Sequence, residues 1–240
     1  LKLDFLYAGA QEGQRHEPLT GAEAYVLAMS LMREAAGDAW ILACGAPVLP
    51  TLGFADSFRT GADIAFEVDP DPRQDYVRWQ ARSTAARSWQ NGLWWWNDPD
   101  QLIVREPFEE SQVTGAVAAN VVSGGTWMLG DDLASMDPGR LSRALDRELV
   151  ELRGQFAKPA APLAYLSGPD ISPVAEWTTP DDEVPIWWTL EGGVVVLLNL
   201  SESTVQVKSP GGREVFSGDE VAAGEVRTLL PGAGEVWFPE

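Results

Sequence analysis

The chain has 240 residues, of which 45% are hydrophobic, and its formal net charge is −19 at pH 7. This length and apolar content predict a folded protein with a sizeable core, and the negative charge argues against nucleic acid or an anionic membrane as a partner. One cysteine and one histidine exclude an internal disulfide framework and a cysteine-rich zinc site. No apolar run reaches the ~18 residues of a membrane-spanning helix. Composition leaves the oligomeric state open and does not fix the compartment, although a cytoplasmic location is favoured.

Strand-like and helix-like segments alternate over about the first 155 residues. Strands are predicted within residues 1–7, 40–49, 58–68, 93–106 and 126–133, and helices over 20–37, 73–92, 113–124 and 138–156. The fourth strand should break at Asn97–Pro99, because a proline cannot sit inside a central ladder. This alternation is typical of parallel strands joined by helical crossovers.

The first helix carries clear boundary signals. Thr20 with Glu23 forms a capping-box pattern, and Gly37 is placed to end the helix. The apolar residues expected on its buried face recur at helical spacing: Tyr25, Ala28, Leu31 and Met32. Asp137 followed by Pro138 predicts the start of the last helix of this half, which we expect to run to about Phe156.

The composition changes near residue 158. Beyond it, short apolar segments such as VPIWWTL, GVVVLLNL, STVQVKS and EVRTLL alternate with the turn sequences EGG, PGGRE and PGAG. This pattern predicts a small antiparallel β-sandwich that packs on the first half without carrying chemistry. The predicted domains are residues 1–157 and 158–240.

Acidic residues cluster at the predicted strand ends of the first half. Carboxylates fall at or after four of these strands: Asp4, Asp63, Asp98, Asp100, Asp131 and Asp132. Because the carboxyl ends of parallel strands meet at one rim, where active sites form, these groups are candidates for catalysis. For Asp98 and Asp131, an ordinary turn or helix-capping role is an equally open interpretation. For Asp4, a structural ion pair with Lys2 is the alternative.

Two kinds of site use such carboxylates without histidine or cysteine: a hard-cation site and the carboxylate pair of a glycoside hydrolase. Lys2 and Arg59 favour the second kind, because fixed cations repel a metal ion but donate hydrogen bonds to sugar hydroxyls. Eleven tryptophans also suit sugar faces, although most should belong to the core.

Five segments together resemble one enzyme family. LKLDFLYAGA, ILACGAP, FRTGADI, WWNDPDQLIVR and GDDL occur in the order found in retaining α-galactosidases. They are similar to the bacterial branch of glycoside hydrolase family 36, whose clan includes the family 27 melibiases, and they cover roughly residues 1–135. The resemblance implies hydrolysis of terminal α-galactosides by double displacement, without a cofactor or metal.

The resemblance also implies roles for individual residues. The K-x-D strand makes Asp4 the nucleophile and Lys2 a donor to sugar hydroxyls. The R-x-G-x-D pattern makes Asp63 the acid/base and Arg59 a ligand near the sugar 2-hydroxyl.

Further matches concern the sugar pocket. Cys44 and Gly45 are expected to line it, and Asp100 is a weaker candidate for binding substrate or supporting the residues that do. Departures from the family pattern flank the site and leave the exact substrate open: Thr60, Ala62 and Gln101.

The family folds as a (β/α)₈ barrel with its nucleophile on the fourth strand. The resemblance therefore implies strands 4 to 8 of such a barrel, followed by the β-sandwich, as the C-terminal portion of a longer enzyme with open strand edges. A full barrel takes about 250 residues. Three alternatives stay open: an α-N-acetylgalactosaminidase or other α-glycosidase of the clan, a non-catalytic carbohydrate-binding remnant, and an oxygen-ligand metal enzyme.

Overall fold

A computed structural model describes residues 1–64, 74–152, 160–167, 170–173 and 187–239. Its first half contains a parallel four-stranded sheet in the order β1-β2-β3-β4. The strands are short: β1 (Lys2–Leu3), β2 (Leu42–Ala43), β3 (Ser57–Arg59) and β4 (Trp96–Asp98). The predicted parallel order is confirmed for these strands, and the part of the third predicted strand beyond residue 64 lies outside the described residues.

The predicted break in the fourth strand is confirmed and divides the strand between two ladders. Its first part, β4, pairs with β3, whereas its second part, β5 (Gln101–Leu102), pairs in parallel with β6 (Met128–Leu129). Pro99 and Asp100 lie between the two parts, and Asp100 has a left-handed backbone with φ of 72°. The chain thus turns at the point where the acidic NDPD segment lies.

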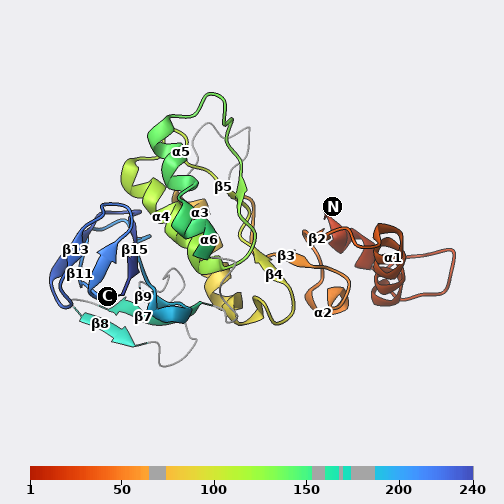
Figure 1. Cartoon of the computed structure of the whole chain (residues 1–240). Coiled ribbons are helices and arrows are strands. Elements are labelled where there is room, and N and C mark those ends of the chain that lie inside the picture. The colour runs from red at the N-terminus through yellow and green to blue at the C-terminus, as the bar shows by residue number, and fades with distance from the viewer. Residues whose placement is uncertain (65–73, 153–159, 168–169, 174–186, 240) are drawn as a thin grey trace.

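Helices connect these strands (Figure 1). They are α1 (Gly21–Ala36), α2 (Val48–Thr51), α3 (Gln74–Arg87), α4 (Glu110–Ser123), α5 (Pro138–Ala144) and α6 (Arg147–Leu152), with 3-10 turns at Leu6–Ala10, Ser88–Gln90 and Glu191–Gly193. The capping box of α1 and its end at Gly37 are confirmed. The single helix predicted from Pro138 is wrong, because two helices, α5 and α6, occupy its described part.

The buried face of α1 differs from the predicted one. Gly21, Tyr25 and Met29 are buried, whereas Leu31 is exposed. The buried stripe faces the 3-10 turn Leu6–Ala10 and α2, where the Tyr25 hydroxyl lies 2.7 Å from Thr51 Oγ1. The elements that pack against α1 therefore determine which of its apolar residues are buried, and these are Tyr25 and Met29 rather than Leu31.

The second half is antiparallel β structure, as predicted. A seven-stranded sheet has the order β13-β12-β15-β10-β9-β7-β8, and β11 pairs with β14 in a separate ladder. The strands are β7 (Ala161–Ser167), β8 (Asp170–Pro173), β9 (Trp187–Thr189), β10 (Val195–Leu198), β11 (Val205–Lys208), β12 (Gly212–Glu214), β13 (Glu220–Val221), β14 (Val226–Leu229) and β15 (Gly234–Phe238). The segment predicted as a PGGRE turn instead enters strand β12 at Gly212. The domain boundary predicted between residues 157 and 158 lies outside the described residues and stays a prediction.

Helix α4 joins the two halves. It packs on β15 and β10 on one side and on α3 and α5 on the other, and ten of its residues are buried. A Cβ on Gly115 would lie 1.8 Å from the Gly232 carbonyl oxygen, so this contact requires glycine. One hydrophobic cluster spans both halves of the chain. It includes Ile103 and Val117 of the first half and Trp188 and Val236 of the antiparallel sheet.

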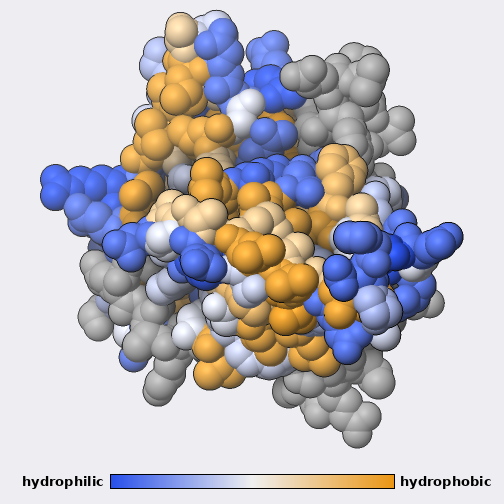
Figure 2. Space-filling view, turned by 90° about the vertical axis from the view of Figure 1, so that its right-hand side faces the viewer, coloured by the Kyte–Doolittle hydropathy of each residue, from blue (hydrophilic) through white to orange (hydrophobic). Residues whose placement is uncertain are grey.

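The parallel sheet has an open edge at β1, which within the described residues pairs only with β2. Large apolar side chains are exposed in this N-terminal region, including Leu1, Leu27, Leu31 and Trp40. Figure 2 views the molecule from this side and shows apolar surface between charged groups. Among the described residues, no helix combines the length and hydrophobicity needed to cross a membrane.

Candidate active site

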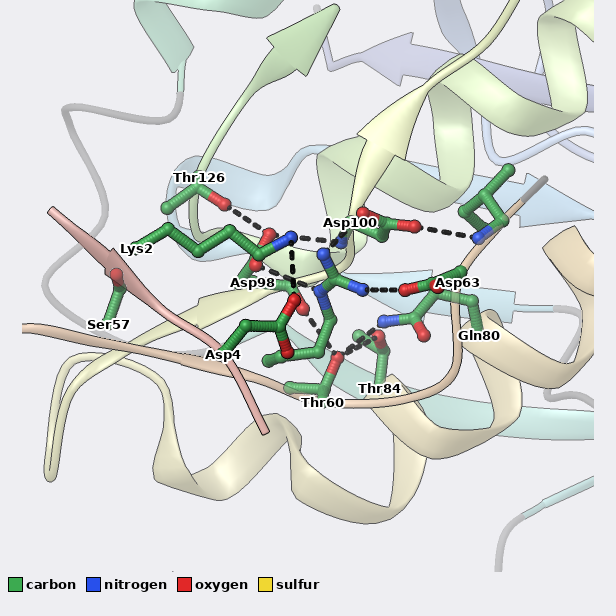
Figure 3. A network of polar contacts seen from close by, with 12 residues as sticks. Lys2, Asp4, Ser57, Thr60, Asp63, Gln80, Thr84, Asp98, Asp100 and Thr126 are labelled. Carbon is green, nitrogen blue, oxygen red and sulfur yellow. Dashed lines mark hydrogen bonds and ion pairs between the residues drawn. The ribbon is translucent and has the colours of Figure 1, made fainter. Parts of the chain in front are cut away.

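Arg59 is the centre of the polar network at the carboxyl ends of β3 and β4 (Figure 3). Its side chain is 3% exposed, and each guanidinium nitrogen contacts a different carboxylate. Nε lies 3.0 Å from Asp98 Oδ2, Nη1 lies 2.7 Å from Asp63 Oδ1, and Nη2 lies 2.5 Å from Asp100 Oδ1. The planar fork of arginine suits such a three-way contact, which a lysine ammonium could not span.

Asp98 is the most deeply buried carboxylate that contacts Arg59. Its side chain is fully buried, and its Oδ1 accepts hydrogen bonds from Thr126 Oγ1 at 2.7 Å and from the Asp100 backbone N–H at 3.0 Å. Thr60 donates from its hydroxyl to the Asp98 carbonyl and is itself contacted by Gln80 Nε2. A buried carboxylate with such partners is held in place, which fixes the orientation of Arg59.

Burial and charge act in opposite directions on Arg59. Burial disfavours the charged guanidinium, but Asp100 and Asp98 more than compensate, so the pKa of Arg59 is raised above its ordinary value. For Asp100, burial is the largest influence and raises the pKa of the carboxyl, although Arg59 and the Ile64 and Gln101 N–H groups oppose it. Arg59 therefore stays a cation.

Asp4 directly follows β1 and adjoins the same network. Its Oδ1 accepts the Phe5 N–H at 2.8 Å, and its Oδ2 lies 3.9 Å from Lys2 Nζ. Hydrogen bonds from the Cys44 thiol and the Phe5 N–H lower the pKa of Asp4, and the charges of Lys2 and Arg59 add to this effect. Phe5 has a left-handed backbone with φ of 53°, a strained conformation of the kind found at functional sites. Asp4 is thus an ionised, half-exposed carboxylate.

Cys44 and Gly45 follow β2, next to Asp4. Burial, followed by the hydrogen bond to Asp4, raises the pKa of the Cys44 thiol to about 11, so the thiol is protonated and acts as a donor. Gly45 has φ of 55°, and its carbonyl accepts the Tyr7 N–H at 2.6 Å. The pair therefore fixes the turn after Asp4.

The structure brings together all the residues predicted for the site. Figure 3 shows Asp4 and Asp63 on two sides of one network, with the Lys2 side chain ending beside Asp4. The side chains of Asp4 and Asp63 are 45% and 49% exposed, whereas Arg59 and Asp100 are buried. The sugar-contacting roles expected for Lys2, Arg59, Cys44, Gly45 and Asp100 stay predictions.

Sequence reasoning gave Thr126 and Gln80 no role and left Asp98 open between catalysis and an ordinary turn or cap. Asp98 belongs to the NDPD segment, where a turn or cap is an equally good interpretation of an aspartate. Asp131 has a different environment, since its carboxylate accepts the Val104 N–H and pairs with Arg105, both at 2.7 Å. It therefore supports the end of the β5–β6 ladder.

The charge distribution suits binding of a neutral polar molecule. In the described ranges, no group of three or more His, Cys, Asp or Glu residues is arranged to hold a metal ion. A fixed guanidinium instead occupies the point where three carboxylates converge. Two accessible carboxylates beside one buried cationic donor, Arg59, and one half-exposed donor, Lys2, can bind hydroxyl groups and exchange protons or bonds with a carbon between them.

No family model matches this chain. Solved structures with a similar fold include a family 27 β-L-arabinopyranosidase from Geobacillus stearothermophilus, with a TM-score of 0.68 and 16% identity over 99% of this chain. α-Galactosidase I from Mortierella vinacea gives a TM-score of 0.68 and 14% identity over 98% of it. The isomalto-dextranase of Arthrobacter globiformis T6, complexed with panose, gives 0.64 and 19% identity over 100% of it.

The chain shares its fold with glycoside hydrolases. It spans 57% of the length of the arabinopyranosidase, 66% of the α-galactosidase and 45% of the isomalto-dextranase. The chain therefore covers no more than about two thirds of any of the three. The α/β half followed by an antiparallel sheet therefore corresponds to part of a barrel-and-sandwich enzyme. At these identities the likeness concerns the fold, and the chemistry has to be argued from the residues.

Proposed function

We propose that this chain carries the catalytic carboxylates of a retaining glycoside hydrolase that cleaves terminal α-galactosides. The observation that carries the proposal is the placement of two accessible carboxylates, Asp4 and Asp63, around the buried Arg59. Membership in glycoside hydrolase family 36, and the correspondence to strands 4 to 8 of its barrel, are part of the same proposal. The motif order supports them, and the shared fold is compatible with them.

Asp4 is the proposed nucleophile. Retention requires a carboxylate that attacks the anomeric carbon and forms a glycosyl-enzyme, and the attacking group must be ionised. Cys44, Phe5 N–H and Lys2 all stabilise the ionised form of Asp4. Water then displaces Asp4 from the sugar carbon, so that two inversions give net retention.

Asp63 is the proposed acid/base. In the first step it gives a proton to the departing oxygen, and in the second it removes one from water. Arg59 Nη1 contacts only one oxygen of Asp63, Oδ1, so the other oxygen is the one proposed to carry the exchanged proton.

Lys2, Arg59, Cys44 and Gly45 are the proposed sugar-binding groups. Lys2 and Arg59 supply charged donors, while the Cys44 thiol and the turn at Gly45 form the wall next to the nucleophile. The open edge of β1 adjoins this wall. We therefore propose that further βα units of a longer polypeptide complete the pocket and are needed for full activity.

The proposal is tested with nitrophenyl α-galactoside and nitrophenyl α-N-acetylgalactosaminide, on this chain and on any longer polypeptide of which it forms part. We expect turnover of the galactoside with α-galactose as the first product by NMR. Preference for the acetylgalactosaminide would instead indicate that related specificity. Galactose binding without turnover would indicate a carbohydrate-binding protein.

Two variants separate the roles of the carboxylates. Asp4→Ala should abolish turnover, and added azide should restore it with inverted β-galactosyl azide as the product, because azide replaces the missing nucleophile. Asp63→Ala should impair substrates with poor leaving groups far more than a dinitrophenyl galactoside, which needs no proton. Asp38→Ala, which removes an exposed carboxylate after α1, is the control. Full activity of Asp4→Ala would refute the mechanism.

A further inference from the structure

Asp100 is placed differently from the two accessible carboxylates. Its side chain is 8% exposed, and both of its oxygens are engaged within the protein. Oδ1 lies 2.5 Å from Arg59 Nη2, and Oδ2 accepts the backbone N–H of Ile64 at 2.7 Å. Ile64 is the residue directly after Asp63. Asp100 therefore connects Arg59 to the backbone that carries Asp63.

These contacts enclose Asp63 from two directions. Arg59 Nη1 contacts the Asp63 carboxylate at 2.7 Å, while the adjacent peptide N–H is bound to Asp100. Asp63 itself is half-exposed after β3, whereas the next residue, Ile64, is buried in the hydrophobic core. The Asp100 carboxylate thus adds a polar restraint, at the Ile64 N–H, to the packing of the Ile64 side chain.

The backbone of Asp100 is consistent with a functional constraint. It is one of two residues other than glycine with positive φ in the described part of the chain, and the second is Phe5, next to Asp4. A left-handed aspartate costs free energy and persists where surrounding contacts enforce it. Here the Asp98 carboxylate accepts the Asp100 N–H at 3.0 Å and holds that conformation.

We propose that Asp100 is a positioning residue for Asp63 and does not bind the sugar. This inference rests on the proposed function, because it assigns Asp63 the acid/base role. Only 8% of the Asp100 side chain is exposed, and each of its oxygens already accepts from a charged or backbone donor, which leaves little of the carboxylate for a sugar hydroxyl. The positioning role instead uses both contacts as they stand.

Two variants remove the contacts to different extents. Asp100→Asn keeps one oxygen acceptor and presents an NH₂ group to a donor, so one of the two contacts is lost. Asp100→Gly removes both and suits the positive φ, which favours folding of this variant. The matched control is Asp56→Asn, because Asp56 Oδ2 likewise joins an arginine (Arg33 Nη1, 3.0 Å) to a backbone N–H (Ile41, 2.7 Å), away from the network around Arg59.

Displacement of the Asp63 carboxyl should lower kcat only for substrates whose leaving group needs a proton. For a galactoside with an alkyl or sugar leaving group, we expect kcat to fall about 10- to 100-fold in Asp100→Asn and further in Asp100→Gly. For a dinitrophenyl galactoside, kcat should fall less than about 3-fold, with KM of both substrates changing little. Asp56→Asn should affect the two substrates equally.

Amide hydrogen exchange gives a readout that does not depend on activity. Exchange at Ile64 should accelerate in Asp100→Gly, which removes its acceptor, whereas Asp56→Asn should leave it unchanged. Unchanged exchange at Ile64, or an equal rise in KM for both substrates with kcat preserved, would overturn the inference while leaving the proposed function intact. Absence of wild-type turnover on both substrates would overturn the proposed function, and the role assigned to Asp100 with it.

Discussion

Replacing Arg59 by lysine tests whether the guanidinium organises the site. Lysine keeps the positive charge but carries its donors on one nitrogen. In the structure, three separate nitrogens of Arg59 contact Asp98, Asp63 and Asp100. A lysine ammonium can approach one of the two buried carboxylates closely, but it cannot hold both in their present places.

The expected loss of stability follows from the burial of each partner. A hydrogen bond to a charged group contributes about 1.5–3 kcal/mol when it is buried, and the lysine gives up one such bond, to Asp98 or to Asp100. The contact with Asp63 is half-exposed and solvent-screened, so its loss adds only about 0–1 kcal/mol. We therefore expect Arg59→Lys to lower the free energy of unfolding by about 1.5–4 kcal/mol.

Urea denaturation, followed by tryptophan fluorescence and circular dichroism, measures this loss. The control is Arg105→Lys, since Arg105 contacts the single carboxylate of Asp131 and its side chain is 41% exposed. We expect the control to lose less than about 1 kcal/mol. Equal losses for the two variants, or a loss below about 0.5 kcal/mol for Arg59→Lys, would show that the three-way contact does not organise the site.

Three further predictions concern other parts of the molecule. Gly115→Ala should lower the free energy of unfolding, measured in urea, by more than about 1 kcal/mol, because the added Cβ would meet the Gly232 carbonyl oxygen. The control is Gly13→Ala, which has open space around it and should change the free energy of unfolding by less than about 0.5 kcal/mol. Iodoacetamide should alkylate Cys44 at pH 8 at least about 100-fold more slowly in the native protein than in urea, because the fold raises the pKa of the Cys44 thiol from 9.0 to about 11. Mass spectrometry measures both rates, and equal rates would contradict this expectation. Asp4 has a pKa lowered from 3.8, so its carboxylate stabilises the fold above that pH and the effect is lost as the pH falls through the lower folded value. Asp4→Asn should therefore be less stable than wild type near neutral pH and converge with it in acid, and a difference independent of pH would refute the assignment.

Local signals in the sequence predicted the elements that depend on neighbouring residues. Thr20 and Glu23 define the start of α1 because both halves of the capping box lie within one turn. Pro99 predicts the division of the strand into β4 and β5, since the missing N–H acts where the proline stands. The start of α6 was also accessible, because the Asp146 carboxylate accepts the Leu149 N–H at 3.1 Å as an N-cap does.

Features that depend on distant partners could not be predicted in the same way. Asp98 pairs with Arg59, 39 positions earlier, and no local pattern separates such an aspartate from one that caps a turn. Leu31 has the spacing of a buried residue, but the 3-10 turn Leu6–Ala10 and α2 pack on the neighbouring face of α1, so Leu31 is exposed. For the site itself, the sequence placed Asp4 and Asp63 at strand ends, while only the structure showed Arg59 between Asp63 and the buried pair Asp98 and Asp100.

Helix α4 limits how this protein can be recombined with others. Its side chains pack into the hydrophobic core of both halves: they contact α3 and α5 of the first half and β10 and β15 of the antiparallel sheet. A chimera joined at the start of the antiparallel sheet would combine a foreign sheet with a helix shaped for Gly232 and Gly234. Exchange of this sheet between homologous proteins should therefore succeed only when α4 is transferred with it.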